Sequence, residues 1–295
     1  PQEEPVDNIE ISEVDWLFRY YHYIYIYINN NMINFISSFY LAGNIERQEE
    51  LDTALKRNIE QPLIKNIYLF LDNRDAYKYL SQNFKLDKVK IKLLGNQPRY
   101  SDLFICANSL QIGEICMISN NDIWLKNISS LLLLTHLEKD MVYSITRYEK
   151  NLKLHKEKKR GNGSSDSFIF RTPVPKEIIE NTNHVQNVWG SENVVNFEFM
   201  MNNFKLYNPC YHIITVHEHK NIERSIERAN VALSKYKNHD FRIAYAYPMD
   251  KKINNIVDFK NTNNAEYLYK ITKSGKYVYK NIPFQEKKKN SFYTL

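Results

Sequence analysis

Hydrophobic and polar residues follow two periods along this chain, and the two periods alternate from residue 32 onward. Short apolar runs typical of buried strands are separated by segments whose apolar residues recur every three or four positions, as on one face of a helix. The predicted strands cover residues 33–41, 64–71, 89–94 and 114–119. The predicted helices cover residues 46–58, 75–83 and 101–110. This alternation predicts an α/β fold in which a mostly parallel central sheet is covered by helices on both faces.

The pattern is less regular after residue 120. It predicts a helix near Leu131, strands over residues 141–147, 166–171 and 211–216, and a helix over residues 193–203. Beyond residue 220 it changes to a charged helix over residues 222–236 and short Tyr-rich strands. We therefore expect three parts, which are an N-terminal extension (1–31), a central α/β domain (32–220) and a small C-terminal appendage (221–295). Within the extension, residues 23–28 alternate Tyr and Ile as a strand can.

Composition limits the class of protein. The chain has 295 residues, of which 43% are hydrophobic and 25% charged, as in ordinary globular proteins. The net charge of +6 is spread along the chain, whereas nucleic-acid-binding proteins more often concentrate it on one face. We therefore expect no nucleic-acid partner. The densest basic run, residues 152–160, leads into a Gly/Ser-rich stretch and predicts a solvated loop, or a segment that helps to hold phosphate or an anionic acceptor.

The cysteines and the apolar runs indicate the cellular compartment in which the protein is expected to work. Cys106, Cys116 and Cys210 lack the spacing of a metal site and are typical of thiols in a reducing compartment. The longest apolar stretch, residues 131–134, is far too short to span a membrane. We expect a cytoplasmic protein with no membrane span, and the sequence does not indicate its oligomeric state.

Short polar side chains follow the strand predicted over residues 114–119. Asn120, Asn121 and Asp122 come directly after it, at the carboxyl end of a strand, where open α/β sheets bind ligands. A carboxylate in this position can hold a divalent cation against a pyrophosphate. The alternative is a turn that caps the next segment.

Two further carboxylates are candidates for a general base. Glu192 lies at the start of an amphipathic helical run, where it could deprotonate an attacking hydroxyl or only stabilise the helix N-terminus. Asp166 opens a strand after the basic loop, and it could bind sugar hydroxyls, act as the base in place of Glu192, or be a turn residue.

Two histidines lie close together near the end of the central domain. His217 and His219 are separated by one residue, so in an extended segment their side chains point to the same side. Imidazole nitrogens beside carboxylate and phosphate oxygens suit Mn²⁺ or a similar ion. The alternative is a surface pair at a strand end.

The first strand-to-helix junction is a typical place for a nucleotide. Here Phe39 or Tyr40 could pack on a base, and Arg47 could reach a phosphate. Neither the dinucleotide-binding glycine pattern nor the P-loop pattern is present, so neither of those two nucleotide-binding folds is supported.

The order of these motifs resembles that of GT-A-type glycosyltransferases. The segments concerned are residues 39–51, with Glu-Arg-Gln-Glu-Glu-Leu, Asn120–Asp122, the Trp-Gly-Ser-Glu-Asn of residues 189–193, and the His-Glu-His of residues 217–219. They are similar to the inverting β-1,4-galactosyltransferase plan. A closer resemblance is to a group of viral and bacterial glycosyltransferases that includes the first domain of a chlorovirus rhamnosyltransferase. That resemblance is carried by residues 100–108, 120–123, 164–170 and 208–219, and it covers roughly residues 32–220.

The resemblance implies that the central domain is catalytic and binds a nucleotide-diphosphate sugar, with UDP as the expected nucleotide and Mn²⁺ or Mg²⁺ as cofactor. The acceptor would be a glycan hydroxyl, and a viral protein of this kind would work in the host cytoplasm. Asp122 and His217 would be metal ligands, and Ser38, Arg47 and Arg99 would lie near the nucleotide.

The sequence departs from the family pattern at two positions. Asn120 stands where the first Asp of the metal motif is expected, so Asn120 is expected to help bind the cofactor, and the cation is expected either to bind more weakly or to be less essential. Glu192 stands where the family has Asp, which leaves Glu192 and Asp166 both open as the base. The alternative function is a non-catalytic nucleotide-sugar or glycan-binding module with a degenerate site.

Overall fold

The computed structural model describes residues 31–128, 132–155, 165–186 and 190–219, together with three later strands, 242–245, 267–271 and 277–281. The strand predicted over residues 23–28 and the helix predicted over residues 222–236 lie outside these ranges. No helix in the described ranges is long and apolar enough to cross a membrane.

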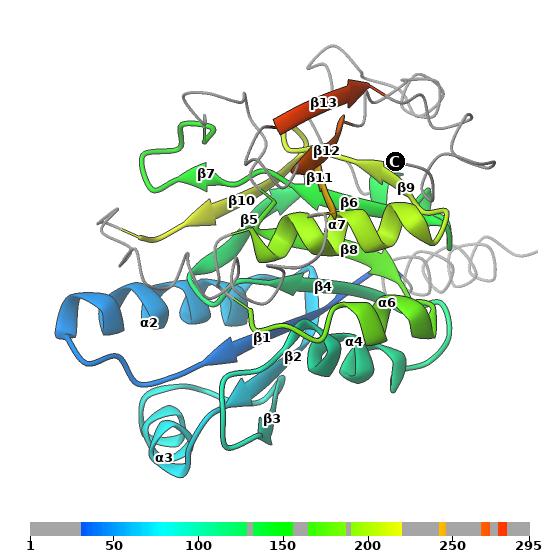
Figure 1. The fold of residues 1–295 in the computed structure, drawn as a ribbon. Helices are drawn as coiled ribbons and strands as arrows, with labels where there is room; N and C mark the ends of the chain where they lie inside the picture. The colour runs from blue at the N-terminus through cyan, green and yellow to red at the C-terminus, as the bar shows by residue number, and fades with distance from the viewer. Residues whose placement is uncertain are drawn as a thin grey trace, which may run out of the picture.

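A seven-stranded sheet forms the centre of the fold (Figure 1). Its strands, in spatial order, are β3 (Val89–Leu93), β2 (Ile64–Leu71), β1 (Ile33–Phe39), β4 (Ile115–Ser119), β8 (Ser167–Arg171), β6 (Met141–Ile145) and β9 (Lys205–Tyr207). Strand β8 is antiparallel to both of its neighbours, and the other neighbouring pairs are parallel. The predicted α/β class with a mostly parallel sheet is confirmed.

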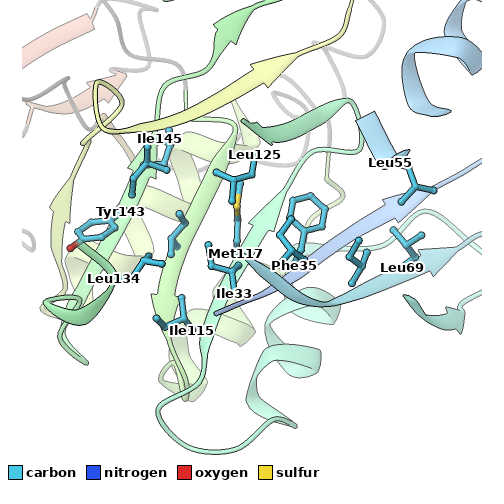
Figure 2. Packing of buried hydrophobic residues seen from close by; sticks show 14 of the residues in the cluster. Ile33, Phe35, Leu55, Leu69, Ile115, Met117, Leu125, Leu134, Tyr143 and Ile145 are labelled. Atoms are coloured by element: carbon cyan, nitrogen blue, oxygen red, sulfur yellow. The ribbon is translucent and has the colours of Figure 1, made fainter. Parts of the chain in front are cut away.

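Side chains alternate between the two faces of the sheet because successive residues of a strand point to opposite sides. Phe35 of β1 and Met117 of β4 face α2 (Ile45–Glu60) and α3 (Arg74–Asn83) within one buried cluster, part of which is shown in Figure 2. Ile36 and Ile118 belong to a second cluster on the opposite face. That face is covered by α4 (Tyr100–Asn108), α6 (Lys176–Asn181) and α7 (Ser191–Met201). Each large side chain buried in this way contributes about 1.5–3 kcal/mol to folding.

Short polar residues set the starts of the helices that follow β1 and β2. Asn44 caps α2 by accepting a hydrogen bond from the backbone N–H of Arg47 at 2.7 Å. Asn73 caps α3 in the same way through the N–H of Ala76 at 2.9 Å. Each cap satisfies an N–H that has no partner within the helix. The cap at Asn44 also fixes Arg47 in the first turn of α2.

A second, smaller sheet lies beside the first. It consists of β5 (Ile123–Ile128), β10 (Ile213–His217) and β7 (Tyr148–Glu149), with β10 in the middle. The sequence predicted a strand over residues 211–216 as part of the core sheet, whereas the structure places β10 in this second sheet, antiparallel to β5. The pattern did not predict β5, β7, β9 or α6. Strands β7 and β9 have only two and three residues, which is too few to show a period.

The Tyr-rich C-terminal strands are present as a three-stranded antiparallel sheet of β11 (Arg242–Tyr245), β12 (Tyr267–Ile271) and β13 (Tyr277–Asn281). Backbone of β11 lies against α7. The short helix predicted near Leu131 corresponds to α5 (Leu132–Thr135). The domain boundaries after residues 31 and 220 stay predictions.

Candidate active site

The candidate site lies where the direction of strand order changes. From β1 the chain continues to β2 and β3 on one side and returns to place β4 on the other side of β1. The carboxyl ends of β1 and β4 therefore border the topological switch point, where open α/β sheets bind their ligands. Ser37 at the end of β1 donates to the carbonyl of Ser119 at the end of β4, at 2.8 Å, so the two ends are joined.

The turn after β4 explains why Asp122 lies beside a histidine 95 residues later. Asn120 to Asp122 reverse the chain, and the N–H of Ile123 donates to the carbonyl of Asn120 at 3.2 Å. Strand β5 starts at once and pairs with β10 so that Ile123 stands opposite His217. The N–H of Glu218 donates to the carbonyl of Asp122 at 3.0 Å and closes the pairing.

Asp122 and His217 meet at this junction. Nε2 of His217 lies 3.2 Å from Oδ2 of Asp122, and only 4% and 7% of the two residues are exposed. Burial alone would raise the pKa of Asp122, but the charges and hydrogen bonds of His217 and Arg47 outweigh it and hold that pKa well below the usual range. For His217, burial lowers the pKa, while Asp122 and Glu149 raise it to about 9. The carboxylates of Asp122 and Glu149 therefore favour the protonated form of His217.

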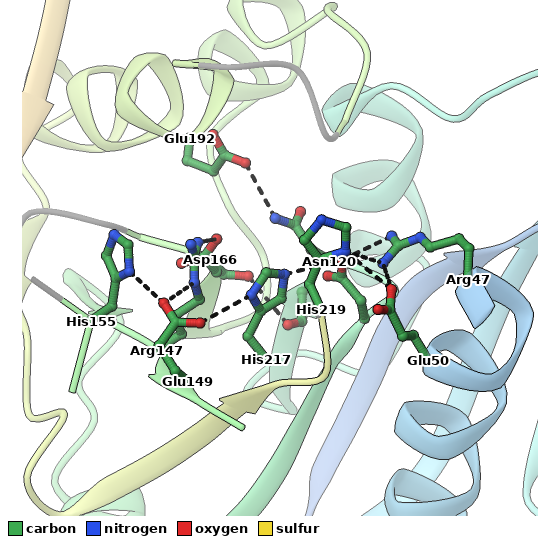
Figure 3. A network of polar contacts seen from close by, with 12 residues as sticks. Arg47, Glu50, Asn120, Arg147, Glu149, His155, Asp166, Glu192, His217 and His219 are labelled. Atoms are coloured by element: carbon green, nitrogen blue, oxygen red, sulfur yellow. Dashed lines mark hydrogen bonds and ion pairs between the residues drawn. The ribbon is translucent and has the colours of Figure 1, made fainter. Parts of the chain in front are cut away.

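Arg47 joins this pair from the first turn of α2. Its Nη2 lies 2.8 Å from Oδ2 of Asp122, and its Nη1 lies 2.8 Å from Oε2 of Glu50 (Figure 3). The same Glu50 oxygen lies 3.0 Å from Nδ1 of His219. Burial lowers the pKa of Arg47, but Asp122, Glu50 and Tyr40 raise it beyond its ordinary value. The structure thus brings together Arg47, Asp122, His217 and His219, and it adds Glu50, which the sequence analysis did not single out.

On its other side, His217 faces a second carboxylate. Oε2 of Glu149, in β7, lies 3.6 Å from Nδ1 of His217, and its Oε1 interacts with Nδ1 of His155. The hydrogen bonds from His155 and His217 are the main reasons why the pKa of Glu149 is lowered far below its ordinary range. The sequence analysis missed Glu149 because a two-residue strand has no visible period.

The two candidate bases have different neighbours (Figure 3). Oδ1 of Asp166 lies 2.6 Å from Nη1 of Arg147, which makes a close buried ion pair. Oε1 of Glu192, in the first turn of α7, accepts a hydrogen bond from the amide of Asn120 at 3.3 Å. The helix cap at this point is Gly190, with a φ of 82° that L side chains rarely adopt. Asn120 therefore links the end of β4 to α7.

Three predicted cofactor-binding residues lie outside the charged cluster. Ser38 donates to Oε1 of the fully buried Gln186 at 3.3 Å. Phe39 is 2% exposed and packs against Tyr79 and Phe84, so in the structure it is a core residue with no open face for a base. Arg99 precedes α4, and its Nη1 donates to the carbonyl of Asn183 at 2.9 Å.

Gln186 is a further residue that the sequence analysis missed. Besides accepting from Ser38, it donates through Nε2 to the carbonyl of Ser119 at 2.8 Å. Its own carbonyl accepts from Gln97 at 2.6 Å. Gln186 thus joins the ends of β1 and β4 to the segment before α7, and nothing in a single Gln of a loop would have indicated it.

The donor atoms at the site fit a divalent cation that is completed by a substrate. In the described ranges, no group of three or more His, Cys, Asp or Glu side chains could hold a metal ion on its own. Asp122 and His217 supply one oxygen and one nitrogen, and nucleotide-bound Mg²⁺ usually takes only one or two carboxylates besides phosphate oxygens. Among the residues that the structure describes, neither side-chain polar atom of the buried Asn121 has a hydrogen-bond partner. Such atoms favour a polar ligand.

Comparison with known proteins finds likenesses to solved structures but none by sequence. No protein-family model matches the chain, and no curated protein matches it by sequence. The mannosyltransferase PcManGT from Pyrobaculum calidifontis, in complex with GDP-Man and Mn²⁺, is similar over 65% of this chain, with 10% identity and a TM-score of 0.43. The matched region is 58% of the length of that chain.

A 4-diphosphocytidyl-2C-methyl-D-erythritol synthase from Anaerococcus prevotii is similar over 71% of this chain and 99% of its own, with 13% identity and a TM-score of 0.43. Neither protein is a viral rhamnosyltransferase, so the viral resemblance stays a prediction.

Proposed function

We propose that this chain is a glycosyltransferase that moves a sugar from a nucleotide-diphosphate sugar, with UDP as the expected nucleotide, to a glycan hydroxyl. The observation that carries the proposal is the meeting of Asp122 and His217 at the switch point between β1 and β4, 3.2 Å apart. Asp122 and His217 would hold Mn²⁺ or Mg²⁺, which when bound neutralises charge on the departing diphosphate. His219, 5.4 Å from His217 between ring centroids, is the next candidate ligand.

Arg47 has a second role in this proposal. Its Nη2 lies 2.8 Å from Oδ2 of Asp122, so a cation held by Asp122 would weaken this contact. The guanidinium would then be available to a phosphate, whose paired oxygens it suits. Arg47 would then bind the diphosphate from the start of α2, with Ser38, Arg99 and Asn120 near the nucleotide.

Glu192 is the better candidate for the general base. Asp166 lies against the guanidinium of Arg147, and an ion pair of this kind disfavours proton uptake by the carboxylate. Glu192 faces the neutral amide of Asn120. As the acceptor oxygen bonds to the anomeric carbon, Glu192 would take its proton, and the bond from that carbon to the diphosphate oxygen would break with its electron pair. This single displacement inverts the anomeric configuration.

The test is binding followed by turnover. Calorimetry with UDP should show affinity that rises when Mn²⁺ is added and that falls in a His217→Gln variant but not in a His136→Gln variant. A panel of nucleotide sugars should then be screened for hydrolysis and transfer with Mn²⁺ present. Metal-dependent UDP binding without any turnover would indicate the non-catalytic binding module instead. Absence of binding to both UDP and GDP would overturn the proposal.

A further inference from the structure

We infer that Glu50 is a positioning residue of this site, which holds Arg47 and His219 in place for the diphosphate. The inference rests on the proposed function for the identity of the ligand, while the arrangement itself is a feature of the structure. Glu50 lies in α2, one turn after Arg47, so the helix brings both side chains to the same face.

One oxygen of Glu50 makes both contacts. Oε2 lies 2.8 Å from Nη1 of Arg47 and 3.0 Å from Nδ1 of His219, and those two nitrogens lie 3.0 Å from each other. These two partners come from different parts of the fold, since Arg47 belongs to α2 and His219 follows β10. Glu50 therefore links the helix after β1 to the end of the second sheet, across the edge of the candidate site (Figure 3).

The burial of Glu50 indicates more than a surface ion pair. Its side chain is 5% exposed, whereas that of Arg47 is 20% exposed. A carboxylate is costly to bury unless it is paired and hydrogen-bonded. A side chain on a helix that served only solubility would face water. The cost is offset here by the guanidinium and the imidazole, which keep Glu50 between them.

The role of Glu50 follows from how the two terminal nitrogens of the Arg47 guanidinium are bound. One terminal nitrogen is held by Glu50 and the other by Asp122, so the guanidinium bridges two carboxylates. If a bound cation weakened the contact with Asp122, the contact with Glu50 would still hold Nη1. Nη2 would then be the nitrogen available to the diphosphate. A guanidinium with one fixed end loses less conformational freedom on binding than an unrestrained one, so the affinity for the diphosphate rises.

The first experiment observes the guanidinium of Arg47 in the protein without any ligand. Nitrogen NMR of the arginine side chains should show a rigid, resolved Arg47 guanidinium in the wild type, assigned by its loss in Arg47→Lys. Glu50→Gln should make that signal mobile. The matched control is Glu60→Gln, the same change at the exposed far end of α2, which should leave the signal unchanged. An unchanged Arg47 signal in Glu50→Gln would overturn the inference.

The second experiment is a double-mutant cycle on affinity, with UDP and GDP as probes in the presence of Mn²⁺. Glu50→Gln should weaken binding of the nucleotide that binds by about 10-fold, as expected for coupled neighbours. In an Arg47→Ala background the same change should have little further effect, because Glu50 acts through Arg47. Equal weakening in both backgrounds would mean that Glu50 does not act through Arg47.

Folding is controlled by measuring the unfolding midpoint of each variant. If Glu50→Gln does not fold, Glu50→Asp replaces it, since the shorter side chain keeps the charge but withdraws the oxygen from Arg47. Failure of the wild type to bind either nucleotide would contradict the proposed function, while the NMR result would still decide the role of Glu50.

Discussion

Two arginines at opposite ends of the strands of the central sheet have different kinds of hydrogen-bond partner. Arg171, the last residue of β8, lies beside the amino end of β4 and donates to three backbone carbonyls, those of Leu137, Gly113 and Leu134, at 2.6–2.9 Å. Arg47, near the carboxyl end of β4, contacts the carboxylates of Glu50 and Asp122. Burial lowers the pKa of Arg171, whereas the carboxylates raise that of Arg47.

The partners explain the difference. Backbone carbonyls are fixed by the fold, so Arg171 joins segments of the chain and has little reason to move. Side-chain carboxylates can exchange a guanidinium for another cation, and two of the partners around Arg47 are also the candidate metal and positioning residues. At the amino end of the strands the polar group joins segments of the fold, whereas at the carboxyl end, under the proposed function, the polar groups would change partners when a ligand binds.

The largest effect is expected at Asp122. Asp122→Asn keeps the shape but removes the charge that Arg47, His217 and the proposed cation share. Transfer should fall by about 10²–10³-fold, the range for loss of one electrostatic contact in an active site. Metal-dependent UDP binding should be lost as well. Steady-state kinetics and calorimetry measure both, and normal turnover in this variant would remove Asp122 from the site.

The next effect concerns the base. Glu192→Gln should lower kcat by about 10²-fold or more, with little change in donor affinity, since only the proton acceptor is lost. Glu180→Gln, on the exposed side of α6, is the control and should behave as the wild type. If Asp166→Asn lowers kcat while Glu192→Gln does not, Asp166 is the base.

A substitution at Arg171, beside the amino end of β4, should lower the stability of the fold without changing nucleotide affinity. Arg171→Met leaves three carbonyls without their donor, and we expect the free energy of unfolding to fall by about 2–4 kcal/mol. UDP affinity of the folded variant should not change, because the contacts lie at the other end of the strands. Urea unfolding and calorimetry test the two statements separately. A large loss of UDP affinity with little loss of stability would contradict the assignment of Arg171 to the fold rather than to the site.

The smallest effect is expected at Asn121. In the described part of the chain its buried amide has no hydrogen-bond partner, so Asn121→Ala should change the free energy of unfolding by less than about 1 kcal/mol. If the amide binds the ligand, UDP affinity should fall about 3- to 10-fold, the equivalent of one hydrogen bond. A stability loss well above that value would show that the amide serves the fold.

Sequence predicted the long elements well, and for a physical reason. Strands such as Ile64–Leu71 and helices such as α2 are long enough to show their period, and β2 matches its predicted range. The shortest strands, β7 and β9, did not show one, and β10 was placed in the wrong sheet. The pairing of Ile123 with His217 depends on the turn after β4 and on contacts across 95 residues, which no local pattern contains.

The candidate site was predicted in part for the same reason. Residue chemistry and position after strands indicated Asp122, His217 and Arg47, and the structure brings these three together. Glu50 and Glu149 were not predicted, because their significance lies in which histidine each faces in space. Phe39 was predicted to pack on a nucleotide base because it is aromatic and lies near the end of the first strand. The alternation of side chains along that strand instead points Phe39 into the core.

The most direct test of the central claim is pulsed electron paramagnetic resonance of Mn²⁺ bound to the protein with UDP. Asp122 and His217 sharing one cation predicts nitrogen modulation from a directly bound imidazole, lost in His217→Gln and kept in His136→Gln. A spectrum with no imidazole nitrogen, or one that His217→Gln leaves unchanged, would contradict the account.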